Sequence, residues 1–354
     1  MVIIDHMRDL DNILNGFDIK GRCVNYERHR HLAFYDVALE PGTTVSKLER
    51  RTREIALALK TKTSPIVKVI SEKGVVRLHV ATSNAETIDL FDMFRSETFP
   101  YNMDLPFLLG ENDEGKKLWT DFSLHPHTLV AGGTGSGKSV FLHTLIANAS
   151  VLKAAGYRDI EIYLSDPKRV EFSSYKDSRI SSLVREIADD YNGTLAMLEY
   201  IKAEMEARYS AMAKLGVQNI SECRGVFSYM MVIIDETADL MLYDRKRREF
   251  ENIVIKLAQK ARAAGIHIVL ATQRPSRDIL TGTIKANFPA RIACKVSSRV
   301  DSQVILDSVG AEHLLGRGDA IIRNHDNDSA RFQVAYSDPK TIIANYAKLI
   351  QWRC

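Results

Sequence analysis

Thr128-Leu129-Val130-Ala131 leads directly into Gly132-Gly133-Thr134-Gly135-Ser136-Gly137-Lys138-Ser139, and this stretch decides the fold. The eight-residue segment fits the pattern GxxxxGK[ST], follows an apolar strand and precedes a helical run over residues 140–146. Glycines let backbone N–H groups approach phosphates, and a helix start adds partial positive charge. We therefore expect a phosphate-binding loop, in which Lys138 contacts the β- and γ-phosphates of ATP and Ser139 is a ligand of Mg²⁺.

The same glycines do not fit the dinucleotide-binding pattern GxGxxG. Counted from Gly133, the final position of that pattern is occupied by Lys138. NAD binding is therefore disfavoured. A chance glycine-rich turn is disfavoured as well, because the strand and the helix lie on the correct sides of the loop.

Two carboxylates follow a second apolar strand. Residues 230–234 are wholly apolar and end at Asp235 and Glu236. In a phosphate-loop ATPase an Asp at such a strand end holds Mg²⁺, and a neighbouring Glu activates the attacking water. The alternative is a strand that runs into a solvated acidic turn, and the phosphate loop upstream argues against it.

Gln273 ends a third apolar strand, which covers residues 267–271. From a neighbouring strand end its amide can contact the γ-phosphate, so we assign it that role. The alternative is that Gln273 caps the turn that follows the strand.

Strands and helices alternate after residue 113. This alternation predicts an α/β fold with a mostly parallel sheet and helices on both faces. Ahead of it, Leu32–Leu39 and two β-branched runs predict a small α+β domain. Pro, Gly and Asn cluster over residues 96–113, which predicts a loop, and we place the boundary between domains 1–100 and 101–354 there. The strand candidates of the larger domain are 127–131, 160–164, 230–234, 266–271 and 291–296.

Composition excludes several classes of protein. The chain has 354 residues, of which 45% are hydrophobic and 26% charged, so it is not a disordered protein. Its net charge is only +3, which is too small for a protein that binds nucleic acid over its whole surface. Its longest apolar stretch, residues 226–234, is far shorter than the roughly twenty residues of a membrane span, so no insertion into a membrane is expected. The cysteines have no metal-binding spacing and predict free thiols in a cytoplasmic protein; they are Cys23, Cys223, Cys294 and Cys354.

Positive charge is local. Residues 274–303 hold six basic and two acidic side chains, a net +4 that exceeds the +3 of the whole chain. Such a cluster neutralises phosphates without base specificity, although a solvated face remains the alternative. Arg262 lies near a helix end closed by Gly265, where it is either an ordinary helix-terminal cation or an arginine finger for a neighbouring ATP site.

Together these residues resemble the FtsK/SpoIIIE family of double-stranded DNA translocases. The resemblance runs from about Leu129 to Asp319 and is most specific over Leu257–Ile284, which contains Ala271-Thr272-Gln273-Arg274-Pro275-Ser276. Residues 20–80 resemble, more loosely, the linking domain ahead of the family's motor. Further family-like segments are 132–139, 166–168 with Glu171, 204–209, 215–219, 234–241, 296–298, 301–302 and 310–316.

The resemblance implies a RecA-like P-loop motor domain that forms a ring, usually a homo-hexamer, with ATP at the subunit interfaces and duplex DNA in the pore. It favours Arg262 as a finger that acts on the neighbour's γ-phosphate. It also implies DNA backbone contacts from Arg274, Lys285 and Arg299, whereas Gln303 stands where many relatives carry a basic residue.

The chain also differs from the cell-division members of that family. Those carry N-terminal membrane spans and a C-terminal winged-helix domain, and neither is expected here. The connection between Asn219 and Met230 is short where relatives often have a long loop. These differences favour a soluble translocase of a virus, plasmid or other mobile element, and a separate membrane or packaging partner protein explains them equally well.

We therefore expect an ATPase that moves double-stranded DNA. Two alternatives remain. A secretion-type ATPase of the same superfamily moves protein and needs no DNA, and the basic cluster argues against it. A non-enzymatic DNA-binding scaffold is expected to have lost at least one of Lys138, Asp235 and Glu236, and all three are present.

Overall fold

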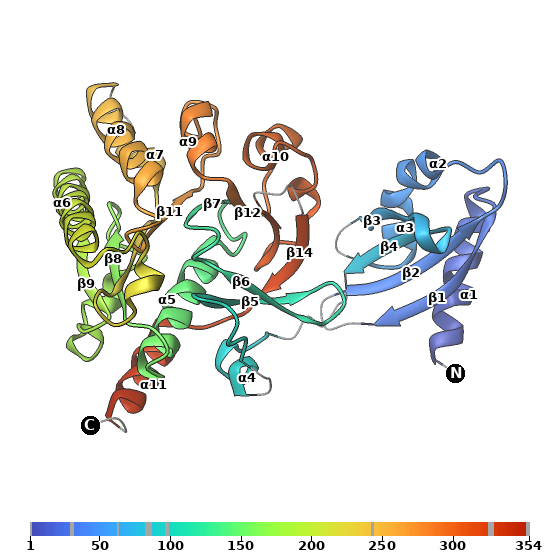
Figure 1. Ribbon diagram of the computed structural model, residues 1–354. Helices are drawn as coiled ribbons and strands as arrows, with labels where there is room; N and C mark the ends of the chain where they lie inside the picture. Colours follow the sequence, from blue (N-terminus) through green and yellow to red (C-terminus); the bar gives the residue numbers. More distant parts are fainter. Residues whose placement is uncertain are drawn as a thin grey trace. The chain divides into compact units, whose positions relative to one another are not determined.

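The computed structural model describes residues 2–28, 32–61, 64–81, 87–95, 99–241, 244–324 and 329–351, so Cys354 lies outside the described residues. The chain divides into two compact units (Figure 1). The first comprises Met1–Thr87 with Asp113–Lys116, and the second comprises Ile88–Asn112 with Lys117–Cys354.

The division after Thr87 precedes residue 100, where the sequence places it. Ile88 and Leu90 are the reason, because both are buried in the core of the second unit. The backbone N–H of Leu90 also donates to the carbonyl of Tyr336, at 3.0 Å, and so fastens this segment to the second unit.

The first unit is the small α+β domain that the sequence predicts. Its four-stranded antiparallel sheet has the order β1-β2-β4-β3. Leu10 and Leu14 of α1 share its core with Leu48, Ile55 and Leu78. The elements are α1 (Val2–Gly16), β1 (Gly21–Arg28), β2 (Leu32–Leu39), α2 (Val45–Arg50), α3 (Thr52–Ala58), β3 (Ile66–Ile70) and β4 (Val75–Ala81).

The second unit is built on a ten-stranded sheet of order β6-β5-β14-β13-β12-β7-β11-β10-β8-β9. The strands from β12 to β9 in this order are parallel, and those from β6 to β12 are antiparallel. The predicted α/β class is therefore confirmed. The strands are β5 (Pro106–Asn112), β6 (Lys117–Asp121), β7 (His127–Ala131), β8 (Ile160–Ser165), β9 (Val184–Ala188), β10 (Tyr229–Ile234), β11 (Ile266–Thr272), β12 (Ala290–Cys294), β13 (Asp319–Arg323) and β14 (Ser329–Val334).

The loop predicted over residues 96–113 is wrong for its second half, which forms β5. Pro106 is the first residue of that strand, where a missing N–H is tolerated. Gly110 lies at an irregularity in the pairing with β6, and a Cβ there would lie 1.8 Å from the carbonyl oxygen of Gln333. The turn-forming residues thus mark a close approach of two strands rather than a loop.

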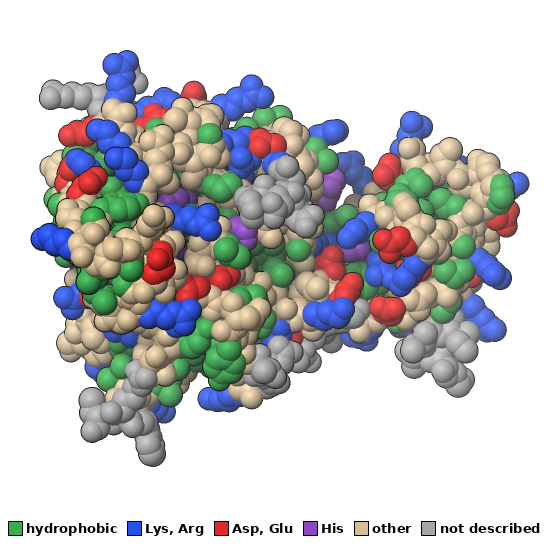
Figure 2. Space-filling view, in the orientation of Figure 1, with side chains coloured by type: hydrophobic (Ala, Val, Ile, Leu, Met, Phe, Trp, Pro, Cys, Tyr) green, Lys and Arg blue, Asp and Glu red, His purple; other side chains and the backbone are tan. Residues whose placement is uncertain are grey.

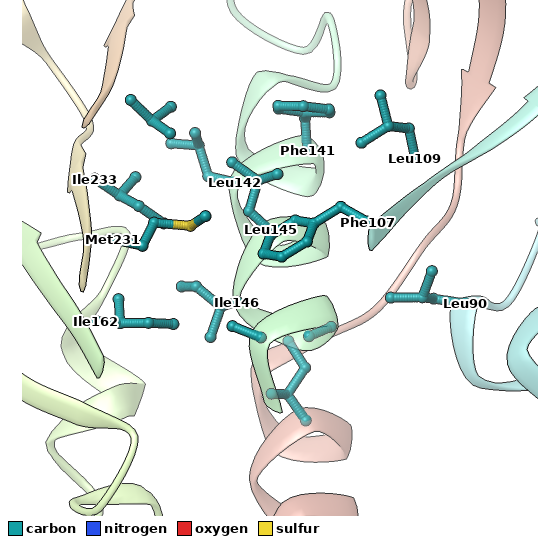
Figure 3. Close-up of a cluster of buried hydrophobic side chains, with 14 of the residues drawn as sticks. Leu90, Phe107, Leu109, Phe141, Leu142, Leu145, Ile146, Ile162, Met231 and Ile233 are labelled. Atoms are coloured by element: carbon teal, nitrogen blue, oxygen red, sulfur yellow. The ribbon is translucent and has the colours of Figure 1, made fainter. Parts of the chain in front are cut away.

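Helices cover both faces of the sheet, and alternate strand residues enter two separate cores. Met231 and Ile233 of β10 belong to one core, whereas Val232 and Ile234 belong to the other. Figure 3 shows Leu142, Leu145 and Ile146 of one helix beside the first of these strand faces. The helices are α4 (Leu90–Arg95), α5 (Lys138–Ala154), α6 (Tyr191–Leu215), α7 (Thr237–Leu240), α8 (Asp244–Lys260), α9 (Gly282–Asn287), α10 (Arg299–Leu306) and α11 (Pro339–Gln351).

The parallel register sets the position of the site. Ala131 of β7 pairs with Thr272 of β11, and Ile234 of β10 pairs with Leu270 of β11. The residues that follow these three strands therefore lie at one edge of the sheet. Among the helices within the described ranges, none is long and apolar enough to cross a membrane.

Candidate nucleotide-binding site

The loop between β7 and α5 is held on both sides by backbone hydrogen bonds. Gly132 N donates to the carbonyl of Thr272 at 3.2 Å, and Gly133 N donates to the carbonyl of Lys295 at 2.9 Å. Gly137 precedes the first residue of α5 with a φ of 107°, and a Cβ there would lie 2.2 Å from the backbone N of Gly318. Only glycine fits this position, because any side chain meets backbone atoms.

Lys138 connects the loop to the acidic strand end. Its side chain is 3% exposed, and its Nζ donates to the carboxylate of Asp235 and, at 2.9 Å, to the Asp235 carbonyl. Burial raises the pKa of Asp235 and outweighs the pairing with Lys138, and the nearby carboxylates of Glu171 and Glu236 raise the pKa further. The site thus gathers negative charge that a cation is able to balance.

Glu236 is held by donors at the end of β11 and lies near a lysine that follows β8. It is 1% exposed, and its carboxylate accepts from the Thr272 hydroxyl at 2.6 Å and from Gln273 N at 3.2 Å. Lys168 Nζ lies 3.5 Å from Glu236 Oε2. Because Asp235 and Glu236 are both buried, the alternative of a solvated acidic turn is excluded.

The Gln273 side chain lies against the phosphate loop. Its Oε1 accepts from the hydroxyl of Thr134 at 3.1 Å. Together with the bond from its backbone N–H to Glu236, this places Gln273 between the loop and the acidic residues. The sequence predicts Thr134 as part of the phosphate-binding loop, but it does not predict this hydrogen bond between Thr134 and Gln273.

The oxygen donors fit Mg²⁺. This ion is usually held by one or two protein oxygens together with substrate phosphates, and the Ser139 hydroxyl and the Asp235 carboxylate are of that kind. In the described part of the chain, no group of three or more His, Cys, Asp or Glu side chains is arranged to hold a metal alone. Glu171, which accepts from Ser139 Oγ at 2.7 Å, is a site residue that the sequence does not single out for a role.

Arg262 lies at the opposite edge of the sheet from the phosphate loop. It follows α8 and precedes β11, whereas Gln273 follows β11. A strand of seven residues spans about 23 Å at roughly 3.3 Å per residue. The exposed Arg262 side chain donates from Nε to the Ser123 carbonyl at 3.1 Å, so it does not serve the loop of its own chain.

The three predicted DNA-contacting residues do not lie together. Arg274 follows the carboxyl end of β11, and Arg299 follows that of β12; both side chains are exposed. Lys285 lies ahead of the amino end of β12 and is paired with Asp307, which also pairs with Arg291 and Arg323. Burial alone would raise the pKa of Asp307, but hydrogen bonds from Lys285 and Arg291 lower it to about 2.

Basic side chains do not form one continuous patch on the face in Figure 2, where Lys and Arg are scattered among acidic and uncharged residues. Arg299 is the first residue of α10, where a cation opposes the helix dipole. Its charge therefore does not stabilise that helix.

Two family models match the sequence. A model described as FtsK/SpoIIIE family matches residues 89–228 and 224–277. A model described as FtsK alpha domain matches residues 2–81, most of the first unit.

Curated relatives cover most of this chain. The DNA translocase SftA of Bacillus subtilis (strain 168) is 37% identical in an alignment 335 residues long, which covers 92% of this chain but 35% of SftA. The DNA translocase FtsK of Haemophilus influenzae is 34% identical in an alignment 374 residues long, which covers 96% of this chain and 70% of that protein. The chain thus spans about a third of SftA and about two thirds of this FtsK.

A solved structure shares the fold. The monomer form of the pCW3 conjugation coupling protein TcpA with ATPγS has a TM-score of 0.67. The two chains are 21% identical, and the match covers 99% of this chain and 100% of TcpA.

Proposed function

The chain belongs to the FtsK/SpoIIIE family, and from this we propose that it is an ATPase that moves along, or pumps, double-stranded DNA. The observation that carries the proposal is the convergence of Lys138, Glu236 and Gln273 at one sheet edge, on strand ends far apart in the sequence. The names of the relatives, which are DNA translocases, support the choice of duplex DNA as the substrate.

The site residues have distinct roles in hydrolysis. Backbone N–H groups of Gly133–Lys138 surround the phosphates of ATP, and Lys138 leaves Asp235 to contact the β- and γ-phosphates. Asp235 and the Ser139 hydroxyl would hold Mg²⁺, which would neutralise phosphate charge. Glu236 takes a proton from the attacking water, and the donors Thr272 and Gln273 keep its carboxylate in place.

A neighbouring subunit completes the site. Arg262 lies at the sheet edge opposite its own phosphate loop, so its charge is available to the ATP of the next copy. There it stabilises the charge that develops on the transferred phosphate. We propose a homo-hexameric ring on this basis, with Arg262 acting across each interface.

DNA contact is assigned to Arg274 and Arg299. Both are exposed, and both follow strands whose ends touch the phosphate loop. Lys285 contributes only if it leaves Asp307. Phosphate contacts of this kind give weak sequence preference and strong salt dependence.

The proposed setting is the cytoplasm, in DNA transfer by a mobile element, a virus or a chromosome. The described thiols of Cys23, Cys223 and Cys294 are free and buried, which suits a reducing compartment. A membrane or packaging protein is the partner that would fix the motor in place.

The deciding experiment measures steady-state ATP hydrolysis with and without linear duplex DNA at two salt concentrations. The Lys138→Ala protein is the blank. We expect strong stimulation by duplex DNA that weakens as salt rises. Robust hydrolysis that is indifferent to DNA contradicts the proposal and favours a secretion-type ATPase with a protein substrate.

A further inference from the structure

Four side chains form one hydrogen-bonded chain that leads away from the phosphate loop. The Ser139 hydroxyl donates to Glu171 Oε2 at 2.7 Å, and Glu171 Oε1 lies 3.0 Å from His143 Nε2. On the other side of the ring, His143 Nδ1 lies 3.0 Å from the Tyr175 hydroxyl. Ser139 and His143 are four residues apart on α5 and therefore face the same side of the helix.

The protonation states of these four hydrogen-bonded side chains follow from their surroundings. Both carboxylate oxygens of Glu171 face hydrogen-bond donors, the Ser139 hydroxyl at 2.7 Å and His143 Nε2 at 3.0 Å, which is the arrangement of an ionised acceptor. Burial raises the pKa of Tyr175 well above its ordinary value. A neutral Tyr175 donates to Nδ1, and the imidazole then donates from Nε2 to an ionised Glu171.

An ionised acceptor decides where the Ser139 lone pairs point. A hydroxyl has one hydrogen, and when that hydrogen is given to a carboxylate the oxygen lone pairs face elsewhere. A metal ligand needs this arrangement, because the cation must meet lone pairs and not the hydrogen.

We propose that Glu171 is a positioning residue for Mg²⁺-dependent nucleotide binding, which orients the Ser139 hydroxyl and is itself held by His143 and Tyr175. The inference rests on the proposed function, because it assigns Mg²⁺ and nucleotide to the same loop. Glu171 acts through Ser139 and does not take part in the chemical step.

A purely structural role for Glu171 is the rival explanation. In that case the carboxylate only ties the segment after β8 to helix α5. That segment is already held independently: Asp166 Oδ2 accepts from Phe172 N at 2.9 Å, and the Asp166 carbonyl accepts from Arg169 N at 2.9 Å. Glu171→Gln keeps the shape of the side chain, but it removes the charge and replaces one of the two acceptor oxygens with an NH₂ donor, so it separates the two roles.

The test titrates the full chain with a fluorescent ADP analogue, once with Mg²⁺ and once with a chelator. For Glu171→Gln we expect affinity in Mg²⁺ to fall about 10- to 100-fold, while affinity in chelator is unchanged. Direct binding of Mn²⁺ with ADP, followed by electron paramagnetic resonance, should weaken by a similar factor. The matched control is Glu186→Gln, an exposed carboxylate on β9 that should leave both affinities as in the wild type.

The coupling to Ser139 gives a second measurement. In a Ser139→Ala background, Glu171→Gln should cause no further loss of Mg²⁺-dependent affinity, since its effect passes through the hydroxyl. Equal losses with and without Mg²⁺, or a full additional loss in the Ser139→Ala background, overturns the inference. A wild-type protein that binds no nucleotide in either condition instead overturns the proposed function.

Discussion

Lys138 donates hydrogen bonds to the carboxylate and to the backbone carbonyl of Asp235, 97 positions further along the chain. The strands that lead to these residues are not neighbours, because β11 lies between β7 and β10. The contact therefore reaches across the end of β11, which Gln273 follows. It brings the phosphate loop, the acidic residues Asp235 and Glu236, and Gln273 together in one site.

Removal of Lys138 should destabilise the fold as well as stop hydrolysis. Lys138→Ala leaves the Asp235 carboxylate buried without its partner, which costs about 3–5 kcal/mol. Adding Asp235→Asn removes that charge, so the double variant should be more stable than the sum of the single losses predicts. Urea unfolding of the three proteins at neutral pH measures this, and strictly additive losses would contradict the importance of the pair.

Glu236→Gln should separate binding from turnover. The amide fills the same buried space between Thr272 and Gln273 but cannot take a proton from water, so we expect ATP binding to persist while hydrolysis falls about 10²- to 10⁴-fold. Rapid-quench kinetics and nucleotide titration measure the two effects. Asp239→Asn is the control and should retain most activity; a Glu236→Gln protein with normal turnover refutes the assigned role.

Acid should destabilise the second unit through two buried histidines. Burial lowers the pKa of His267 to about 4 and that of His127 to about 3, against an ordinary value of 6.5. Between those values the unfolded chain binds more protons than the folded one, so stability is full above pH 6.5 and falls as pH drops toward 4, by at most about 1.4 kcal/mol per pH unit for each histidine.

The histidine prediction is checked by urea unfolding of His267→Phe at pH 7 and pH 5. This variant should lose less stability on acidification than the wild type. The exposed His313 provides a control in His313→Asn, which should leave the pH dependence unchanged. An identical pH dependence in all three proteins would show that His267 does not govern acid stability.

Arg262 should act on the ATP of another subunit. Arg262→Ala should bind nucleotide normally and lose about 10³-fold or more in turnover. Mixing it with the inactive Lys138→Ala protein should restore part of the activity, because some interfaces then combine an intact loop with an intact Arg262. Hydrolysis measured across mixing ratios tests this, and a mixture that stays inactive at every ratio argues against action between subunits.

The two exposed arginines should dominate DNA affinity. Arg274→Ala and Arg299→Ala should each weaken duplex binding and reduce the slope of log K against log[salt] by about one. Lys285→Ala should change both quantities less, since Lys285 already pairs with Asp307. Fluorescence anisotropy at several salt concentrations checks all three, and a larger effect at Lys285 would reverse the assignment.

Local sequence patterns predict the site because the residues that follow parallel strands all lie at the same edge of the sheet. Asp235 and Gln273 each end an apolar strand, and strands of one direction bring their carboxyl ends to one edge. The sequence therefore predicts these residues without any knowledge of strand order. The same reasoning finds α/β alternation but misses β5, whose Pro106 and Gly110 have the composition of a loop.

Such patterns do not predict contacts between side chains that are distant in the sequence. Lys285 has the charge of a DNA contact, and nothing near it in sequence shows that Asp307 will neutralise it when α10 packs against β12. Glu171 is similar, because its role appears only when β8 brings it beside Ser139. Both contacts depend on how helices and strands pack, and composition and residue spacing do not predict individual contacts of this kind.

The backbone bonds of the phosphate loop also form a mechanical linkage. Gly132 is tied to Thr272, two residues before Arg274, and Gly133 is tied to Lys295, four residues before Arg299. Main-chain atoms therefore connect the loop to both arginines without any intervening side-chain contact. If the chain is the motor that we propose, substitutions of surrounding side chains should alter its speed more readily than its step length.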